Sequence, residues 1–580
     1  MAKTVADQLV DMLSEAGVKR IYAVTGDSLN NVNDAVRRSE GKIRWIHVRH
    51  EEVGAYAASA EAQLTGKLAC CAGSSGPGHV HLINGLYDAH RAAAPVLAIA
   101  STVMSKEFGT EYFQETNTIK LFDDCSHYNQ IAVTPQQLPR MLQAGIQHAV
   151  HRKGVAVIGL PGDVTDKDAE ESVTSMHFYN PESVTRPSDK ELQNLAALIA
   201  AHDKITIYCG IGATGAHDEV VAFAEKIKAP VAYSYRGKME IQHDNPYEVG
   251  MTGLLGLPSG YNSMHKASLV ILLGTDFPYI DFMPTDNKIV QIDLKPERLG
   301  RRAKLEMGLC GSIKHTLQAL MPFLSAKNDN DFLKEQLDFY EKVKENNQTY
   351  VKDRGKIDAI HPEFLASTIN KLATADAIFT MDTGMCCVWG ARYINSTGKR
   401  SMIGSFNHGS MANAMPQAIG AALAFPERQV VAFCGDGGLS MLLGDLATVM
   451  QYKLPIKLIV FNNKSLGMVK LEMEVAGLPD WQTDMANPDF AAVAAAFGIK
   501  GITINDPENL EVAMQQAFAT EGSVLVNVMT DPNALSMPPE IEFKQVKGMA
   551  TAMGKLILDG KISEVVDTVK SNYKHIKDVI

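Results

Sequence analysis

The sequence predicts an α/β protein made of three consecutive parallel-sheet α/β domains followed by a C-terminal helical tail. Short apolar runs alternate with segments of helical periodicity along the 580 residues, which is typical of βαβ units. Linker-like or highly charged segments separate these runs into three groups. The length also fits, since roughly 100–200 residues per domain gives about three to five domains.

The first group spans residues 1–180 and predicts a first domain. A helix is expected over residues 55–64, between the second and third strands. The apolar runs that predict strands are 21–24, 43–48, 67–72, 96–100 and 155–159. Residues 180–189 hold Pro181 and Pro187 among Ser and Thr, which indicates a linker.

The second group predicts a domain over residues 190–335, and the third predicts one over 345–532. Strands are expected in the second domain at 205–209, 231–235, 269–273 and 289–292. The charged segment 327–356 predicts a solvated helix and connector. In the third domain a helix is expected over 439–452, and the expected strands are 377–381, 429–434, 456–461 and 523–528. Residues 533–580 form the tail.

Composition and charge exclude several classes of protein. The net charge of −11 argues against a dedicated nucleic-acid binder, which usually carries a basic face. The sequence contains no run of about 18 or more apolar residues, so it predicts no helix that crosses a bilayer. The N-terminus shows no secretory signal, and the eight cysteines follow neither zinc nor disulfide spacing. We therefore expect a cytoplasmic protein with reduced thiols.

The most informative motif is Gly435-Asp436-Gly437-Gly438, which follows an apolar strand. Asn463 follows the next strand, with 26 residues between Asp436 and Asn463. This spacing leaves room for a helix and a return to the neighbouring strand, so both clusters should lie at carboxyl strand ends, where open α/β sheets bind ligands. One carboxylate and one amide oxygen suit Mg²⁺, and glycines let the backbone approach a diphosphate. The alternative is a pair of ordinary turns.

The GDGG…NN pattern resembles the diphosphate–magnesium motif of thiamine diphosphate (ThDP) enzymes. The resemblance implies that Asp436, the side chain of Asn463 and the backbone oxygen of Ser465 bind Mg²⁺. It also implies that three glycines and one methionine contact ThDP: Gly435, Gly437, Gly438 and Met411. The methionine, from the segment NHGSMANAMP, would support the bent cofactor, although a core methionine is equally compatible with the sequence.

Three elements of the first domain extend the resemblance. In Arg49-His50-Glu51-Glu52, Glu51 is expected to bind the cofactor's aminopyrimidine ring and activate it. The loop 73–78, with Gly76, would face the same ring. In Phe113-Gln114-Glu115, Phe113 would form an apolar wall of the substrate pocket and Gln114 would hydrogen-bond the substrate. The alternative for Glu51 is an exposed acidic helix start, and loop packing is the alternative for Phe113.

The second domain carries Gly210-Ile211-Gly212-Ala213-Thr214-Gly215, which formally fits a dinucleotide-binding loop but is weak evidence alone. The acidic residue of an NAD site, expected about 20 positions on, is missing. The family resemblance points to FAD instead. The residues it places at FAD are Gly210, Gly212, Gly274, Thr275, Phe277 and Asp293.

Residues 466–472 would cap the substrate pocket, with Met468 and Glu472 contacting the reacting groups. Leu471-Glu472 stands where acetolactate synthases carry Gln-Trp. The whole chain resembles the pyruvate:quinone oxidoreductases, the acetate-forming pyruvate oxidases of the ThDP family. This implies oxidative decarboxylation of pyruvate to acetate and CO₂, with electrons passing through FAD to a quinone, in a homotetramer whose active sites span two subunits.

Three alternatives remain open at the level of sequence. An O₂- and phosphate-dependent pyruvate oxidase would make acetyl phosphate and H₂O₂. An acetolactate synthase would carry FAD only as a relic. A catalytically silent scaffold is the third possibility.

The tail carries a possible membrane signal. Residues 562, 565, 566, 569, 573 and 576 form one apolar helical stripe flanked by lysines. Such a helix could lie on a lipid surface at the inner face of the cell membrane, or could dock on its own protein or on a neighbouring subunit.

Overall fold

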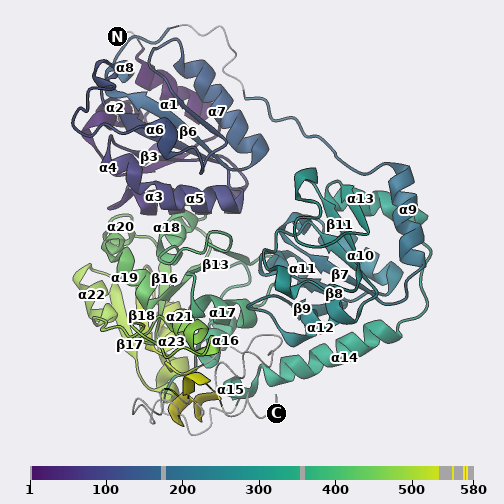
Figure 1. The fold of residues 1–580 in the computed structure, drawn as a ribbon. Helices are drawn as coiled ribbons and strands as arrows, with labels where there is room; N and C mark the ends of the chain where they lie inside the picture. The colour runs from purple at the N-terminus through teal and green to yellow at the C-terminus, as the bar shows by residue number, and fades with distance from the viewer. Residues whose placement is uncertain are drawn as a thin grey trace.

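The computed structural model describes residues 3–170, 178–352, 359–534, 551–553, 555, 566–568 and 570–572. Within these residues the chain forms three parallel six-stranded sheets, each covered by helices, as predicted. We name the N-terminal, central and C-terminal domains after these sheets. Figure 1 shows the N-terminal domain above the C-terminal domain, with the central domain beside both.

The N-terminal sheet has the strand order β2-β1-β3-β4-β6-β5. Its strands are β1 (Arg20–Ala23), β2 (Arg44–His47), β3 (Ala69–Gly73), β4 (Val96–Thr102), β5 (Tyr128–Ile131) and β6 (Val155–Pro161). Its helices are α1 (Val5–Glu15), α2 (Asn30–Arg38), α3 (Glu51–Thr65), α4 (Pro77–His81), α5 (Ile83–Ala92), α6 (Thr118–Leu121), α7 (Leu138–Arg152) and α8 (Gly162–Thr165).

The central sheet has the order β12-β11-β10-β7-β8-β9. Its strands are β7 (Ile205–Cys209), β8 (Val231–Tyr233), β9 (Glu248–Met251), β10 (Leu269–Leu273), β11 (Lys288–Asp293) and β12 (Met307–Cys310). Its helices are α9 (Asp189–Ala200), α10 (His217–Ile227), α11 (Lys238–Ile241), α12 (Pro258–Lys266) and α13 (Ile313–Leu320). Helices α14 (Asp331–Asn346) and α15 (Thr349–Lys352) lead on to the C-terminal domain.

The C-terminal sheet has the order β14-β13-β15-β16-β18-β17. Its strands are β13 (Ile378–Met381), β14 (Ser401–Gly404), β15 (Val430–Gly435), β16 (Ile456–Asn462), β17 (Lys500–Ile504) and β18 (Val524–Met529). Its helices are α16 (Pro362–Leu372), α17 (Met385–Tyr393), α18 (Ala414–Ala424), α19 (Asp436–Met441), α20 (Leu446–Gln451), α21 (Gly467–Val475), α22 (Phe490–Ala496) and α23 (Leu510–Ala519).

The N-terminal and C-terminal domains share one apolar core, which runs from Tyr22 and Ala57 to Ile419 and Val430. Helix α3 packs directly on α18 (Figure 1). A Cβ at position 420 would collide with the carbonyl of Ala57, so glycine at 420 lets the two helix backbones touch. This contact fixes how the two domains are oriented.

Two predicted helices differ from the structure. The helix expected over residues 439–452 is broken between α19 and α20, because Leu442 leaves the helical region of backbone conformation. The break allows Asp445 to accept a hydrogen bond from the Arg49 N–H (2.9 Å). The charged helix expected over 327–356 is solvated on one side only, since α14 buries Phe332 and Tyr340 among other side chains.

The few described residues of the tail lie against the C-terminal domain. The Asn572 side chain is fully buried and donates to the Asn533 carbonyl (2.7 Å), and Lys555 donates to the Gly477 carbonyl (2.8 Å). Of the predicted apolar stripe, Val566 is described and is 43% exposed; the other stripe positions lie outside the described residues. In the described part of the chain, no helix combines the length and apolar character needed to span a membrane.

Candidate active site

The loops after β15 and β16 lie side by side, as the motif spacing predicts. The two strands pair in parallel, with Gly435 opposite Phe461. Asp436 begins α19 directly after β15 and is 3% exposed. Its Oδ1 accepts from the Gly437 N–H (2.9 Å) and its Oδ2 from the Lys464 N–H (2.8 Å). The carboxylate therefore joins the two loops at the carboxyl edge of the sheet.

The electrostatics around Asp436 fit a bound cation. Burial raises the pKa of Asp436, while hydrogen bonds from Gly437, Asn487 and Lys464 oppose that shift. No lysine, arginine or histidine forms an ion pair with it among the described residues. A buried carboxylate with only neutral donors lacks a counter-charge, which a divalent cation would supply.

The other two predicted magnesium ligands lie on the adjacent loop. Asn463 Oδ1 accepts from the Ser465 N–H (3.1 Å), and the Ser465 hydroxyl is buried with no hydrogen-bond partner in the described structure. Clusters of three or more His, Cys, Asp or Glu that could hold a metal are absent from the described residues. The predicted set is of another kind, because it has one carboxylate, one amide and one backbone oxygen.

The glycines of the GDGG motif make room for specific side chains. A Cβ at position 437 would lie 3.1 Å from Met411 Cε and from Leu466 Cδ2, so Met411 lies beside the motif. A Cβ at 438 would collide with the Asp382 carboxylate. Asp382, which the sequence interpretation missed, accepts from the Gly435 N–H (3.1 Å), and burial raises its pKa to about 7.

Glu51 is the first residue of α3 and is 6% exposed, so it is not an exposed acidic helix start. Its Oε2 lies 2.9 Å from His81 Nδ1. A Cβ at Gly78 would lie 3.1 Å from Oε1, so the predicted glycine loop lies directly against this carboxylate. His81 was also missed from sequence, because nothing in its local pattern distinguishes it from a helix-surface histidine.

The glycine loop and the FQE segment of the first domain meet. Gly76 has φ +66°, and a Cβ there would lie 2.8 Å from Gln114 Cβ. The Ser75 hydroxyl donates to Gln114 Oε1 (3.0 Å), and Gln114 itself has φ +65°, a conformation that non-glycine residues adopt at a cost. Phe113 is 78% exposed on this single chain rather than enclosed in a pocket.

The segment expected to cap the substrate pocket forms α21. Met468 is partly buried against the C-terminal core, and the exposed Glu472 interacts electrostatically with Tyr279 of the central domain. Asn463 and Gly467 line a small pocket together with Thr568 of the tail. A described part of the tail therefore reaches the loop that carries a predicted magnesium ligand.

The two predicted halves of the site lie on different domains. The hydrogen bonds described for Glu51 come from the N-terminal domain, and those for Asp436 come from the C-terminal domain. Hydrogen bonds such as Arg49–Asp445 and Asn84–Ser410 link the two domains near these residues.

The glycines predicted at FAD are in tight backbone contact with one another. The Gly212 N–H donates to the Gly274 carbonyl (2.8 Å), and a Cβ at position 212 would lie 2.8 Å from Gly274 Cα. A Cβ at Gly210 would collide with Thr275. These glycines are therefore required by the packing of two loops, after β7 and after β10.

Beside these loops, a cavity of about 230 Å³ is lined by Thr275 and Phe277. The lysines and arginines that line it are Arg91, Lys153, Lys295, Arg298, Arg301 and Arg302. Asp293 ends β11 nearby; it is 5% exposed, accepts from the Lys295 N–H (2.9 Å), and burial raises its pKa. So many cations around one cavity fit an anionic group such as a nucleotide diphosphate. The volume is below the roughly 300–1,000 Å³ of whole-ligand pockets, so it would take only part of a dinucleotide.

The fold is that of an α/β protein with glycine-rich loops at the carboxyl edges of parallel sheets, where open α/β sheets bind ligands. Three family models match the chain: the thiamine pyrophosphate enzyme N-terminal TPP binding domain at residues 3–121, the central domain at 192–320 and the C-terminal TPP binding domain at 382–528. The chain belongs to the thiamine pyrophosphate enzyme family, and thiamine pyrophosphate is the ThDP expected from sequence.

Several relatives match nearly the whole chain. A Bacillus subtilis protein, provisionally named as thiamine pyrophosphate-containing, is 35% identical over 98% of this chain and 99% of its own length. The pyruvate oxidase of Lactiplantibacillus plantarum is 31% identical over 88% of this chain and 85% of its own. An acetolactate synthase large subunit of Parasynechococcus marenigrum is 29% identical over 90% of this chain and 87% of its own length. These similarities support ThDP-dependent catalysis related to pyruvate.

Proposed function

We propose that this protein is a ThDP-, Mg²⁺- and FAD-dependent pyruvate oxidoreductase that forms acetate and reduces a quinone. The balanced reaction is pyruvate plus water plus quinone giving acetate, CO₂ and quinol, so two electrons pass from substrate to quinone. The observation that carries the proposal is the buried, cation-free Asp436 carboxylate bridging two loops in a ThDP-family domain.

The chain would supply positioning and proton handling. Asp436, Asn463 and the Ser465 backbone oxygen would hold Mg²⁺, and Met411 beside Gly437 would support the bend of ThDP. Glu51, enclosed by the Gly78 loop, would hold a proton at the aminopyrimidine ring. When bound, ThDP supplies the electron sink for loss of CO₂ and FAD accepts two electrons.

The substrate would be recognised by residues around the Gly76 loop. Gln114, fixed by Ser75, would donate to the substrate, and Phe113 would cover it with an apolar surface. Met468 and Glu472 of α21 would close the other side. Because Phe113 is 78% exposed on one chain, we propose that a second subunit covers it in a homotetramer.

In the central domain, Thr275 and Phe277 would contact FAD, while the arginines of the adjacent cavity would bind its diphosphate. Asp293 would accept from a ribose hydroxyl, and Gly210, Gly212 and Gly274 would keep the loops close together. The division into domains at 1–180, 190–335, 345–532 and 533–580 belongs to the same proposal. The tail, which reaches the Asn463 loop through Thr568, would contact membrane lipid when it moves away.

A pyruvate oxidase is favoured over an acetolactate synthase by one sequence feature. Leu471-Glu472 replaces the Gln-Trp pair of acetolactate synthases, and Glu472 lies close enough to Tyr279 to affect its pKa. The charge at position 472 thus faces the domain that we propose binds FAD.

The test is an anaerobic spectrum of the purified protein loaded with ThDP, Mg²⁺ and FAD. Pyruvate should bleach the flavin, a quinone analogue should restore it, and acetate should equal quinol formed. An unbleached flavin with formation of acetolactate would show a synthase instead. Recovery of the flavin only with air and phosphate would show an acetyl phosphate-forming oxidase.

Glu51→Gln tests the role of the buried carboxylate. Turnover of pyruvate should fall by about 10²–10⁴, as expected for loss of a general acid–base group. Glu52→Gln is the matched control, because the Glu52 side chain accepts a hydrogen bond from Asn84 (2.7 Å) and has no proposed chemical role. Equal turnover in the two variants would reject the role of Glu51.

A further inference from the structure

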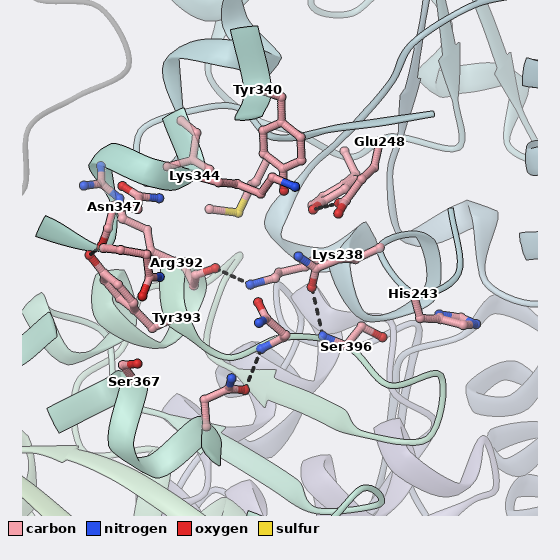
Figure 2. A pocket seen from close by; sticks show the side chains of 18 of the residues that line it. Lys238, His243, Glu248, Tyr340, Lys344, Asn347, Ser367, Arg392, Tyr393 and Ser396 are labelled. Carbon is pink, nitrogen blue, oxygen red and sulfur yellow. Dashed lines mark hydrogen bonds between the residues drawn. The ribbon is translucent and has the colours of Figure 1, made fainter. Parts of the chain in front are cut away.

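A second and larger cavity lies where the central domain, α14 and the C-terminal domain meet. Its volume is about 480 Å³, within the range of about 300–1,000 Å³ typical of small-molecule sites. Figure 2 shows its lining, with Lys238 below Tyr340 and Lys344. None of the residues that we place at ThDP, Mg²⁺, FAD or pyruvate lines it.

Lys238 is the most unusual residue of the wall. It begins α11 and is 2% exposed. Its ammonium group donates to the carbonyls of Ala391 and Ile394, both at 2.6 Å, at the C-terminal end of α17. These carbonyls carry the negative end of the helix dipole. A lysine ammonium has three N–H donors, so these two hydrogen bonds leave the third donor unused.

Lys238 has no counter-ion among the residues that the structure describes. No carboxylate forms an ion pair with it in the part of the chain that the structure describes. The wall carboxylate Glu248 is engaged by the Tyr233 hydroxyl (2.7 Å). Burial lowers the pKa of Lys238 to about 7, and Glu248 opposes the shift only from a distance. A buried cation without a counter-ion is costly, and the adjacent cavity leaves space for an anion.

The other charged and titratable wall groups are already engaged or lie to one side. Lys344 stands over the Tyr340 ring (4.8 Å to its centroid), and burial raises the pKa of Glu248. Arg392 donates to the carbonyls of Leu255 and Gly256 (3.2 Å each). Of the other wall groups, Tyr393 donates to the Asn347 carbonyl (2.8 Å), His243 stacks on His217 (ring centroids 4.0 Å apart), and Asp244 also lines the cavity.

The wall is not uniformly polar. Met251, Leu257 and Ala391 contribute apolar surface, while Ser367, Asn370 and Ser396 contribute neutral polar groups. An inorganic anion would leave the apolar part of this wall unused. An organic anion would place its charge at Lys238 and its carbon chain on the apolar side chains, where burial of each CH₂ is worth about 0.8 kcal/mol.

We propose that this cavity is a binding site for a small organic carboxylate, with the Lys238 ammonium as its anchor. This goes beyond the proposed function, because the site requires neither ThDP nor FAD. The ligand's carboxylate would accept a hydrogen bond from the third N–H of Lys238 and provide the missing counter-charge.

The proposal is tested by isothermal titration calorimetry of the full-length protein loaded with ThDP, Mg²⁺ and FAD. Acetate, butyrate and inorganic phosphate are the probes. Butyrate should bind more tightly than acetate, and phosphate should bind least. Lys238→Met should weaken butyrate binding about tenfold or more, as expected for loss of a charge-assisted hydrogen bond. Lys266→Met is the matched control, because Lys266 is exposed and paired with Glu335. This substitution should not change butyrate binding.

Two measurements do not depend on the folding of the Lys238 variant. Glu248→Gln removes a like charge from the wall and should tighten butyrate binding about threefold or more. In the wild-type protein, binding near pH 7 should take up protons, since a bound carboxylate stabilises the charged lysine; titrations in buffers of different ionisation enthalpy measure this. Saturable butyrate binding that survives Lys238→Met, tighter binding of phosphate, or no saturable heat at all would overturn the proposal.

Discussion

Two glycine-rich turns follow buried parallel strands in this protein, and they serve different physical purposes. After β15, Gly437 lies against the ends of flexible side chains, Met411 and Leu466, beside the buried Asp436. After β7, Gly212 lies against the backbone of Gly274. The first loop leaves adaptable space beside an uncompensated carboxylate, whereas the second is filled by the chain itself. A glycine pattern alone therefore does not distinguish a ligand cradle from a close packing of loops.

The largest expected effect is that of Asp436→Ala. Removing a direct ligand should weaken Mg²⁺ and ThDP binding by at least the roughly 10–100-fold typical of losing a partner of a ligand, and should abolish decarboxylation. Equilibrium dialysis of Mg²⁺ and assay of CO₂ release measure the two effects. Asp506→Asn, an exposed carboxylate that caps a short helix of the same domain, should behave like wild type. Unchanged Mg²⁺ binding in the Asp436 variant would remove the distinction between the two loops.

The next pair of variants compares the loops directly. Gly212→Ala should destabilise the protein by about 1–3 kcal/mol, because the new methyl group meets fixed backbone. Gly437→Ala should cost at most about 1 kcal/mol, because the side chains around it can move. Its apparent affinity for ThDP should nevertheless fall about tenfold or more, since a small displacement at a positioned site is costly.

Urea unfolding of the two glycine variants measures their stability, and titration with ThDP measures their affinity for the cofactor. If Gly437→Ala is the more destabilised protein, the loop after β15 is as tightly packed as the loop after β7. The contrast drawn between them would then be wrong.

The smallest effect concerns Asp293, the buried carboxylate of the central domain. Burial raises its pKa in the folded protein, so the folded state binds more protons than the unfolded state above the ordinary Asp value of about 3.9. The free energy of unfolding therefore falls as pH rises from there to the folded pKa. Asp293→Asn should remove this slope and gain stability relative to wild type across that window.

Thermal unfolding between pH 3 and 7 measures the Asp293 effect. Asp34→Asn is the control of opposite sign, because hydrogen bonds from Arg37 and Arg38 lower the pKa of Asp34. That variant should lose stability relative to wild type as pH rises. A difference between Asp293→Asn and wild type that does not vary with pH would contradict the buried, ionisable state of Asp293.

The buried strands could be predicted from sequence, whereas of the edge strands only β2 was predicted. The runs at Ile205–Cys209 and Leu269–Leu273 were predicted with the bounds that the structure shows, because a strand covered on both faces is apolar throughout. The strands that were missed are β5, β9, β12, β14 and β17, and all of them lie at sheet edges. An edge strand is partly solvated and carries mixed residues, so its pattern resembles a loop.

Sequence patterns alone predict the α/β class, the buried strands and the adjacency of the Asp436 and Asn463 loops, because local periodicity and short βαβ spacing follow from neighbouring residues. Only the tertiary structure placed His81 at Glu51, Asp382 at Gly438, and Lys238 at the end of α17. In each case the contact depends on how separate helices and strands pack. The approach of Lys238 to Ala391 joins residues 153 positions apart, which no local pattern encodes.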